Sequence, residues 1–352
     1  MAEKKYFTRM GDASPCEMSS DEIMSDIREA VAQASKRGKV DPLTQSDMDF
    51  IADVIMAPDT MVTVAPGRNV VSTTDIGCYK MLYATGVPMD RCDEALVRER
   101  GFCGDSTDFG YEDYSFKPTK ASVDTYEAKQ MQNVLDRTTM PILYGAMPNL
   151  GLYTKPDGPV GNWNELLPAG KIQEARDAQE EAVLLAVEDI VYVARKMYAM
   201  GADGINLDTV GAAGDADMLA SLIAVKRIKD EMPNLGIEMG MAGEFVLGMH
   251  GKLEYNGTIL AGLYPHKQIK LCEDVGCDIF GSVVNTNCSK SAAWNFARVA
   301  TLTKACVKAA NIPVHANAGM GVNGMPMTLT MPVDMVSRAD KCLVELCNVD
   351  GL

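Results

Sequence analysis

The sequence lacks the features that mark membrane, nucleic-acid-binding and secreted proteins. No run of about 18 apolar residues occurs, so no transmembrane helix is expected. Basic residues are too few to balance the acidic ones. The formal net charge is −15, which argues against a nucleic acid or an anionic membrane surface as partner. No apolar segment follows the basic residues of the N-terminus, so no signal peptide is expected and the chain is predicted to be cytoplasmic.

Clustered cysteines and histidines are also missing. The chain has ten cysteines but no C-x-x-C pair, and only three histidines, which are scattered: His250, His266 and His315. Without a signal peptide, the cysteines are expected to be free thiols rather than a disulfide framework. The spacing of these residues predicts no metal site.

From about residue 121 the sequence alternates between short apolar strands and amphipathic helices. Strand starts are predicted near residues 142, 204, 236, 278, 312 and 350, and helices over 172–200, 217–231, 266–275, 290–310 and 332–347. Such alternation is typical of a parallel sheet with helical crossovers. The turns at Gly201, Gly276 and Asn348 are 75 and 72 residues apart, and each interval holds two units. About 36 residues per unit is close to the allotment in a (β/α)8 or TIM-type barrel; an open doubly wound sheet is the alternative.

The first part of the chain looks less regular. Residues 19–38 and 44–56 have the apolar spacing and the polar first residues of capped helices, and residues 61–77 are predicted to form a hairpin around Pro66-Gly67. We therefore expect a cap of helices and a hairpin over residues 1–120 and a partial barrel over 121–352. With six strands in place of eight, this barrel would be incomplete at its C-terminus.

Polar residues follow several of the predicted strands, and in barrels the carboxyl ends of the strands form the active site. The candidate catalytic residues are Asp208, Glu238, Glu244 and His315, and the candidate substrate-binding residues are Tyr144, Asn206, Asn285 and Asn317. Each one alone could be a hydrogen-bonded wall position, but the set predicts a polar cavity. Three carboxylates with one imidazole suit a small cationic substrate, such as an amine, better than a phosphate.

Residues Gly319 to Gly324 match the pattern G-x-G-x-x-G, but prolines and no helical pattern follow them. A dinucleotide site requires a helix directly after the glycines. The segment is therefore predicted to be a loop at the end of a strand.

Several loop motifs occur in an order and at spacings that match one known family. They are PILYGAMPNLGLYTKPDGP, GADGINLDTVGAAGDADM, GMAGEFVLGMHG, LAGLYPHKQ, NTNCSKSAAWNFAR and NVDGL. Through these motifs the whole chain resembles the dimethylamine:corrinoid protein methyltransferases, which are pyrrolysine-containing methylamine methyltransferases of methanogenesis. The resemblance implies a (β/α)8-type fold. It also implies transfer of one methyl group from dimethylamine to the Co(I) corrinoid of a small partner protein, with release of monomethylamine.

The resemblance further implies that pyrrolysine follows the segment VDGL, and so comes directly after Leu352. Addition of the amine to the pyrrolysine imine needs a general acid within hydrogen-bond reach. Glu244, Glu238 and Asp208 are the candidates for this acid, with His315 and Asn285 as orienting groups. No tightly bound cofactor is expected in the chain itself, because the corrinoid belongs to the partner.

Two other interpretations remain open at this point. The chain without pyrrolysine is expected to be inactive, so it could be a non-catalytic truncated fragment. It could also belong to another barrel enzyme, such as a different corrinoid- or pterin-dependent methyltransferase or a decarboxylase. The protein is expected to form a homo-oligomer.

Overall fold

A single parallel sheet organises the chain. The computed structural model describes residues 4–65, 68, 70–75, 106–113, 143–145, 150–212, 214–248, 250–328 and 331–352. For residues 70–75, 106–113, 143–145 and 208, it describes only the backbone. The sheet has seven strands in the order β3 (Val70–Asp75), β4 (Ser106–Asp113), β5 (Leu143–Gly145), β6 (Gly204–Val210), β7 (Gly236–Met241), β10 (Ile279–Ser282) and β11 (Val314–Ala316). Every neighbouring pair is parallel. Spatial order therefore follows chain order, without the reversal that marks a doubly wound sheet.

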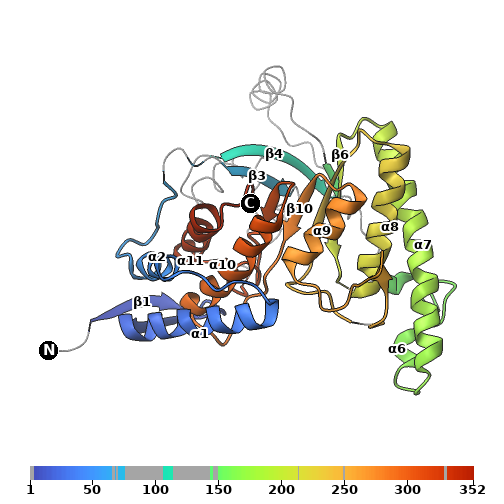
Figure 1. Cartoon of the computed structure of the whole chain (residues 1–352). Coiled ribbons are helices and arrows are strands. Elements are labelled where there is room, and N and C mark those ends of the chain that lie inside the picture. The colour runs from blue at the N-terminus through green and yellow to red at the C-terminus, as the bar shows by residue number, and fades with distance from the viewer. Residues whose placement is uncertain are drawn as a thin grey trace, which may run out of the picture.

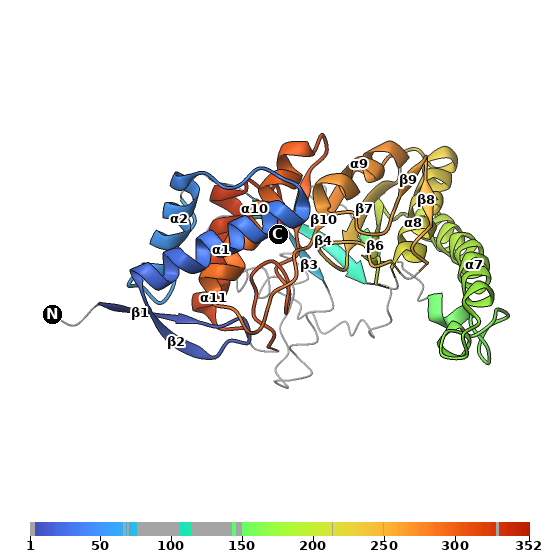
Figure 2. The ribbon, with the colours of Figure 1, turned by 60° about the horizontal axis from the view of Figure 1, so that its bottom comes forward.

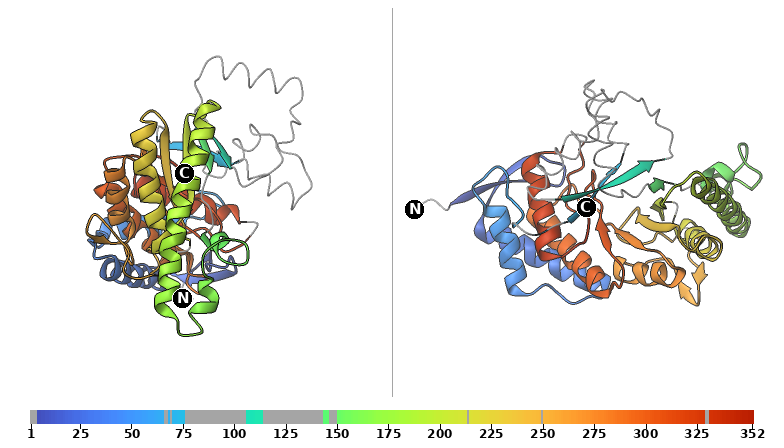
Figure 3. Two further views of the ribbon diagram at one scale, coloured as in Figure 1. Left: turned by 90° about the vertical axis from the view of Figure 1, so that its right-hand side faces the viewer. Right: turned by 90° about the horizontal axis from the view of Figure 1, so that it is seen from above.

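Helices connect the later strands and lie along one side of the sheet (Figures 1 and 3). They are α7 (Ile172–Ala199), α8 (Asp215–Glu231), α9 (Pro265–Val275) and α10 (Ala292–Ala309), and β11 is followed by α11 (Val333–Lys341) and the π-helical turn η3 (Cys342–Leu346). Shorter elements lie in the connections: η2 (Leu150–Tyr153), α6 (Trp163–Leu166), β8 (Glu254–Tyr255) and β9 (Thr258–Ile259). The helices predicted from the apolar spacing are confirmed, as are five of the six predicted strands. Within the described residues, no helix is both long and apolar enough to cross a membrane.

The N-terminal segment forms a small layer outside the sheet. Strands β1 (Lys5–Arg9) and β2 (Pro15–Ser19) pair in antiparallel register, and helix α1 (Ser20–Gly38) packs along α10, with α2 (Gln45–Met56) beside it (Figure 2). Both helices begin with a capping box. Ser19 and Glu22 cap α1, and Thr44 and Asp47 cap α2, each pair exchanging side-chain and backbone hydrogen bonds. These reciprocal bonds satisfy amides that would otherwise lack a partner, which is why both helix starts were visible in the sequence.

Two strands of the parallel sheet, β3 and β4, fall within the region that the sequence assigned to the cap. The predicted hairpin over 61–77 is wrong, because residues 61–65 form no strand and β3 pairs in parallel with β4; its turn at Pro66-Gly67 lies outside the described residues. The strand count of six is also corrected. In the described residues the parallel sheet has seven strands, and residue 350 precedes a single parallel bridge, between Gly351 and His315, rather than a strand. The sheet thus runs across the boundary expected between residues 120 and 121.

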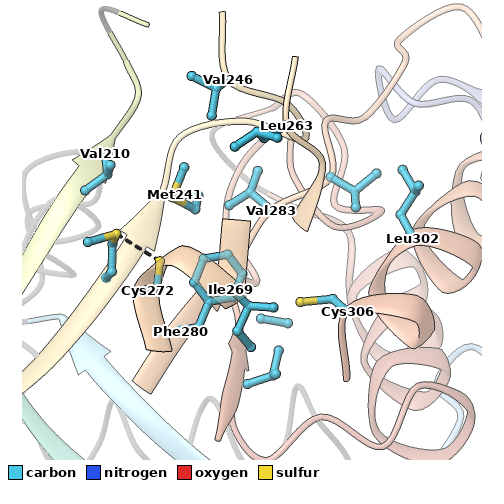
Figure 4. Packing of buried hydrophobic residues seen from close by; sticks show 14 of the residues in the cluster. Val210, Met241, Val246, Leu263, Ile269, Cys272, Phe280, Val283, Leu302 and Cys306 are labelled. Carbon is cyan, nitrogen blue, oxygen red and sulfur yellow. Dashed lines mark hydrogen bonds between the residues drawn. The ribbon is translucent and has the colours of Figure 1, made fainter. Parts of the chain in front are cut away.

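The helix-facing side of the sheet is apolar. Ile237, Met239 and Phe280 point toward the helices and are buried. Figure 4 shows Phe280 among Ile269 and Cys272, and the Cys272 thiol donates a hydrogen bond to the sulfur of Met239 at 3.2 Å. Because side chains alternate along a strand, the residues between these apolar ones must project from the opposite face.

Two aspartates, one before β10 and one near the end of the chain, attach the segments that follow them to the neighbouring strands. The Asp278 carboxylate accepts the N–H of Ile237 at 2.7 Å, and the Asp350 carboxylate accepts the N–H of Val314 at 2.9 Å. The backbone N–H groups of both aspartates donate to the carbonyls of the same two partners, at 2.8 and 2.9 Å. The aspartates that follow the evenly spaced turns at Gly276 and Asn348 therefore set the register between neighbouring backbone segments.

Replacing Asp278 with alanine tests this role. The variant leaves the Ile237 N–H without its acceptor and also removes the contact with Lys229 at 2.6 Å. Because the side chain is half exposed, we expect a loss of about 1 kcal/mol in the free energy of unfolding, measured by urea denaturation. Asp274→Ala, on the exposed side of α9, is the matched control and should cause no measurable change.

Buried thiols predict how stability depends on pH. Burial raises the pKa of Cys272, Cys306 and Cys342, and raises that of Cys347 to about 12. At pH 8 these thiols are protonated in both states, but above about pH 9 they ionise only in the unfolded chain. The free energy of unfolding should then fall by up to about 1.4 kcal/mol per pH unit for each thiol. Urea denaturation at pH 8 and pH 10 measures it, and equal stability at both would contradict burial of the thiols.

Candidate functional site

The face of the sheet opposite the helices carries polar residues and glycines. Asn206 of β6 lies beside Glu238 of β7, and His315 of β11 lies beside Gly281 of β10, which in turn pairs with Gly240. Asn206 and Glu238 are buried, although a carboxylate is rarely buried without a partner. This face is therefore built to hold polar groups in a fixed position.

Glu238 and His315 form the central contact of the site. The Nδ1 atom of His315 lies 3.0 Å from Oε1 of Glu238, and the two side chains are 16% and 4% exposed. They belong to strands that are separated by β10, and at Gly281 no side chain stands between them. A Cβ atom at residue 281 would lie only 2.8 Å from the Cα of Gly240, so the close approach of β10 and β7 requires glycine there.

Glu244 is held differently. It lies in the loop after β7 and forms a buried, two-pronged ion pair with Arg298 of α10: Nε of Arg298 donates to Oε2 at 3.2 Å, and Nη2 donates to Oε1. Arg298 also lies over the ring of Trp294 and donates to Gln33 of α1 at 3.2 Å. Both carboxylate oxygens of Glu244 are thus engaged by the protein, which fits an anchor for the loop better than a group that reaches a substrate.

The loops after β10 and β11 hold the two remaining asparagines. Asn285 and Asn317 are both exposed, and Oδ1 of Asn285 accepts the N–H of Glu244 at 3.1 Å. Between them lies the fully buried Asn323, whose side chain accepts the N–H of Val284 at 2.9 Å and donates to the carbonyl of Asn317, also at 2.9 Å. Asn323 belongs to the glycine-rich segment 319–324, which is a loop, as predicted from the prolines that follow it.

Two predicted residues are placed by backbone register alone. Asp208 of β6 pairs with Gly240, which puts it two residues beyond Asn206 on the same strand and in register with the glycine face. Tyr144 of β5 pairs with Ile205, whereas its neighbour Gly145 pairs with Asn206. Tyr144 is thus one residue off the backbone register of Asn206 and Glu238. This register does not support the prediction that Tyr144 belongs to the site.

The surroundings of the site are acidic and partly apolar. Burial raises the pKa of the Tyr264 phenol, and the Glu244 carboxylate raises it further. Tyr264 stacks in a tilted arrangement on Phe245, with ring centroids 5.7 Å apart, beside the Glu244 anchor. Within the described part of the chain, no group of three or more His, Cys, Asp or Glu residues is arranged to hold a metal ion. The arrangement can bind a small cation and hold a proton at a carboxylate–imidazole pair.

Comparison with known proteins places the chain in a family. A model of the dimethylamine methyltransferase family matches residues 4–352. The chain belongs to that family. Among solved structures, it is similar to the Bacillus cereus spore cortex-lytic enzyme SleL, with 10% sequence identity and a TM-score of 0.33, over 86% of this chain and 64% of SleL. The chain thus spans less than two thirds of the length of SleL.

Three residues that hold this arrangement carry no clear signal in the sequence. Arg298 lies 54 positions after Glu244 and inside a helical pattern. Asn323 lies in the glycine-rich segment, whose pattern points only to nucleotide binding. Gly281 carried no signal by itself, since the need for glycine arises only when β10 is packed against β7.

The Glu244–Arg298 pair makes a prediction about stability. Arg298→Met leaves the Glu244 carboxylate buried without its counter-charge, so we expect a loss of about 3–5 kcal/mol in the free energy of unfolding. Arg195→Met provides the control, because Arg195 pairs with Glu231 on the exposed surface and its removal should change little. Combining Arg298→Met with Glu244→Gln should recover part of the loss. A double variant no more stable than Arg298→Met would contradict a direct interaction.

Proposed function

We propose that the chain forms most of the wall of a (β/α)8 barrel that transfers a methyl group from dimethylamine to the Co(I) corrinoid of a partner protein. Monomethylamine is the second product. Family membership supports the amine as substrate, and the acidic, glycine-lined face of the sheet supports a small cation at that place. The barrel is supported by the seven parallel strands in chain order and by the bridge between Gly351 and His315, where an eighth strand would add.

The Glu238–His315 contact is the observation on which the proposal depends. At neutral pH dimethylamine is a cation, and the buried Glu238 carboxylate attracts it while Asn206 borders the same face. When the carbon–nitrogen bond of the dimethylammonium ion breaks, the nitrogen keeps the electron pair of that bond. The nitrogen must also keep both of its protons, so that neutral monomethylamine leaves. The imidazole of His315, fixed by Glu238, can hold one of these protons at the nitrogen.

The groups that lie outside the chain have limited roles in this proposal. The corrinoid supplies the nucleophilic cobalt, and pyrrolysine, which the resemblance places after Leu352, supplies an electrophilic imine. Because the corrinoid belongs to the partner, no residue of this chain is assigned to holding it. Asp208 remains a candidate acid by its register, while Glu244 acts through its pair with Arg298 as the anchor of the loop after β7.

Glu238 and His315 can be tested in the full-length, pyrrolysine-containing protein. Glu238→Gln keeps the shape but removes the charge, and His315→Asn removes the proton-holding ring. We expect each to lower the rate of methyl transfer from dimethylamine by roughly 10²–10⁴, the usual contribution of a general acid or base. The visible spectrum of the corrinoid protein measures this rate.

Glu254→Gln, on the exposed strand β8, is the matched control and should keep the wild-type rate. The double variant of Glu238 and His315 should be no slower than the worse single variant if the two act as one unit. Wild-type rates in both single variants would reject the pair and leave Asp208 as the remaining candidate.

A further inference from the structure

The turn of the N-terminal hairpin reaches the loops that follow β10 and β11. Met10 forms an antiparallel bridge with Ser291, and the N–H of Gly11 donates to the carbonyl of Lys290 at 2.8 Å. On its other side, the carbonyl of Gly11 accepts the N–H of Met327 at 2.9 Å. One residue of the hairpin therefore connects the loop of residues 283–291 with the loop of residues 317–328.

These two loops carry candidate site residues and contact each other directly. Asn285 forms an antiparallel bridge with Val322, and the N–H of Thr286 donates to the carbonyl of Gly321 at 2.8 Å. Asn323 adds side-chain bonds to both loops. The position of Asn285 relative to Asn317 thus depends on how closely the two loops are held together.

Residue 11 must be glycine because a side chain would not fit there, and not because of its backbone conformation. Its φ angle is not positive, but a Cβ atom at this position would lie 2.2 Å from the carbonyl oxygen of Asn287 and 3.0 Å from Nδ2 of Asn295. Asn295 itself donates to the carbonyl of Asn287 at 3.1 Å and accepts its N–H at 2.8 Å. Any side chain at residue 11 must therefore push the hairpin away from the loop after β10.

The hairpin is also anchored on its far side. The Nε atom of Arg9 donates to both carboxylate oxygens of Asp334 at the start of α11, at 3.1 and 2.8 Å. Nη1 of Arg9 donates to the carbonyl of Ala13 at 3.0 Å and so stiffens the turn. The turn between β1 and β2 is thus bonded to α11 and to both loops, so it can determine the positions of the loops after β10 and β11.

We propose that Gly11 is a positioning residue of the methyltransferase, through which the hairpin turn sets the relative position of the loops that carry Asn285 and Asn317. The inference rests on the proposed function, since those loops border the amine site only if the site is the one described above. Gly11 itself does not touch the substrate. Its effect is to hold the polar groups at the carboxyl ends of β10 and β11 in one geometry.

The test compares Gly11→Ala with Ala13→Gly in the full-length, pyrrolysine-containing protein. Ala13 lies in the same turn with a φ of 72°, so glycine there relieves strain and should leave activity unchanged. For Gly11→Ala we expect kcat/KM for dimethylamine to fall by roughly 10–100-fold, as a misplacement of about 1 Å does. Arg9→Met, which loosens the anchor without adding atoms to the turn, should act in the same direction and more weakly.

Amide hydrogen exchange provides a readout that does not depend on activity. In Gly11→Ala the Met327 amide, which loses its acceptor, should exchange faster, while the Phe280 amide, bonded to the carbonyl of Pro313 at 3.0 Å, should not. Faster exchange at Met327 with unchanged kcat/KM would overturn the inference, and so would unchanged exchange. If the wild-type protein transfers no methyl group, the proposed function fails, while the exchange result still reports whether Gly11 holds the two loops together. If Gly11→Ala fails to fold, Arg9→Met decides, and wild-type kcat/KM in that variant would overturn the inference.

Discussion

The close approach of β10 to β7 at Gly281 is the constraint on which the site depends. Only glycine fits there, because a Cβ atom would lie 2.8 Å from the neighbouring Cα. With no side chain at this position, Glu238 and His315 meet across an intervening strand at 3.0 Å. The polar pair is thus a consequence of backbone packing, and the apolar side chains on the other face of the same strands, such as Phe280, keep that packing in place.

Around this pair, buried polar side chains hold the loops at the carboxyl ends of the strands. Arg298 fixes the loop after β7 through Glu244, and Asn323 joins the loops after β10 and β11. Such groups cost free energy when they lack partners, so a fully bonded arrangement favours one loop geometry over others. In this arrangement the Glu238 carboxylate and the His315 imidazole are held in one fixed geometry, which the proposed function assigns to a small cation.

Much of the helical part of the fold could be predicted from the sequence, because capping residues and apolar spacing are local signals. Strand β4 could not, since STDFGYED is rich in polar residues and does not look like a buried strand. The predicted hairpin covers β3, but its pairing with β4 depends on contacts far apart in the chain. The sequence indicated that Glu238, Glu244 and His315 belong near one end of the strands. It could not show which carboxylate pairs with the imidazole and which with Arg298, because those pairings depend on register and on contacts far apart in the chain.

The central claim is that this inner face acts on dimethylamine. It is tested most directly by adding dimethylamine to the protein, with the pyrrolysine of the proposed function in place, together with a reduced corrinoid protein, and by following the visible spectrum of the corrinoid. The proposed function predicts that the Co(I) spectrum is replaced by that of the methylated corrinoid, with one monomethylamine released per methyl group. No spectral change, or a spectral change without release of monomethylamine, would contradict it.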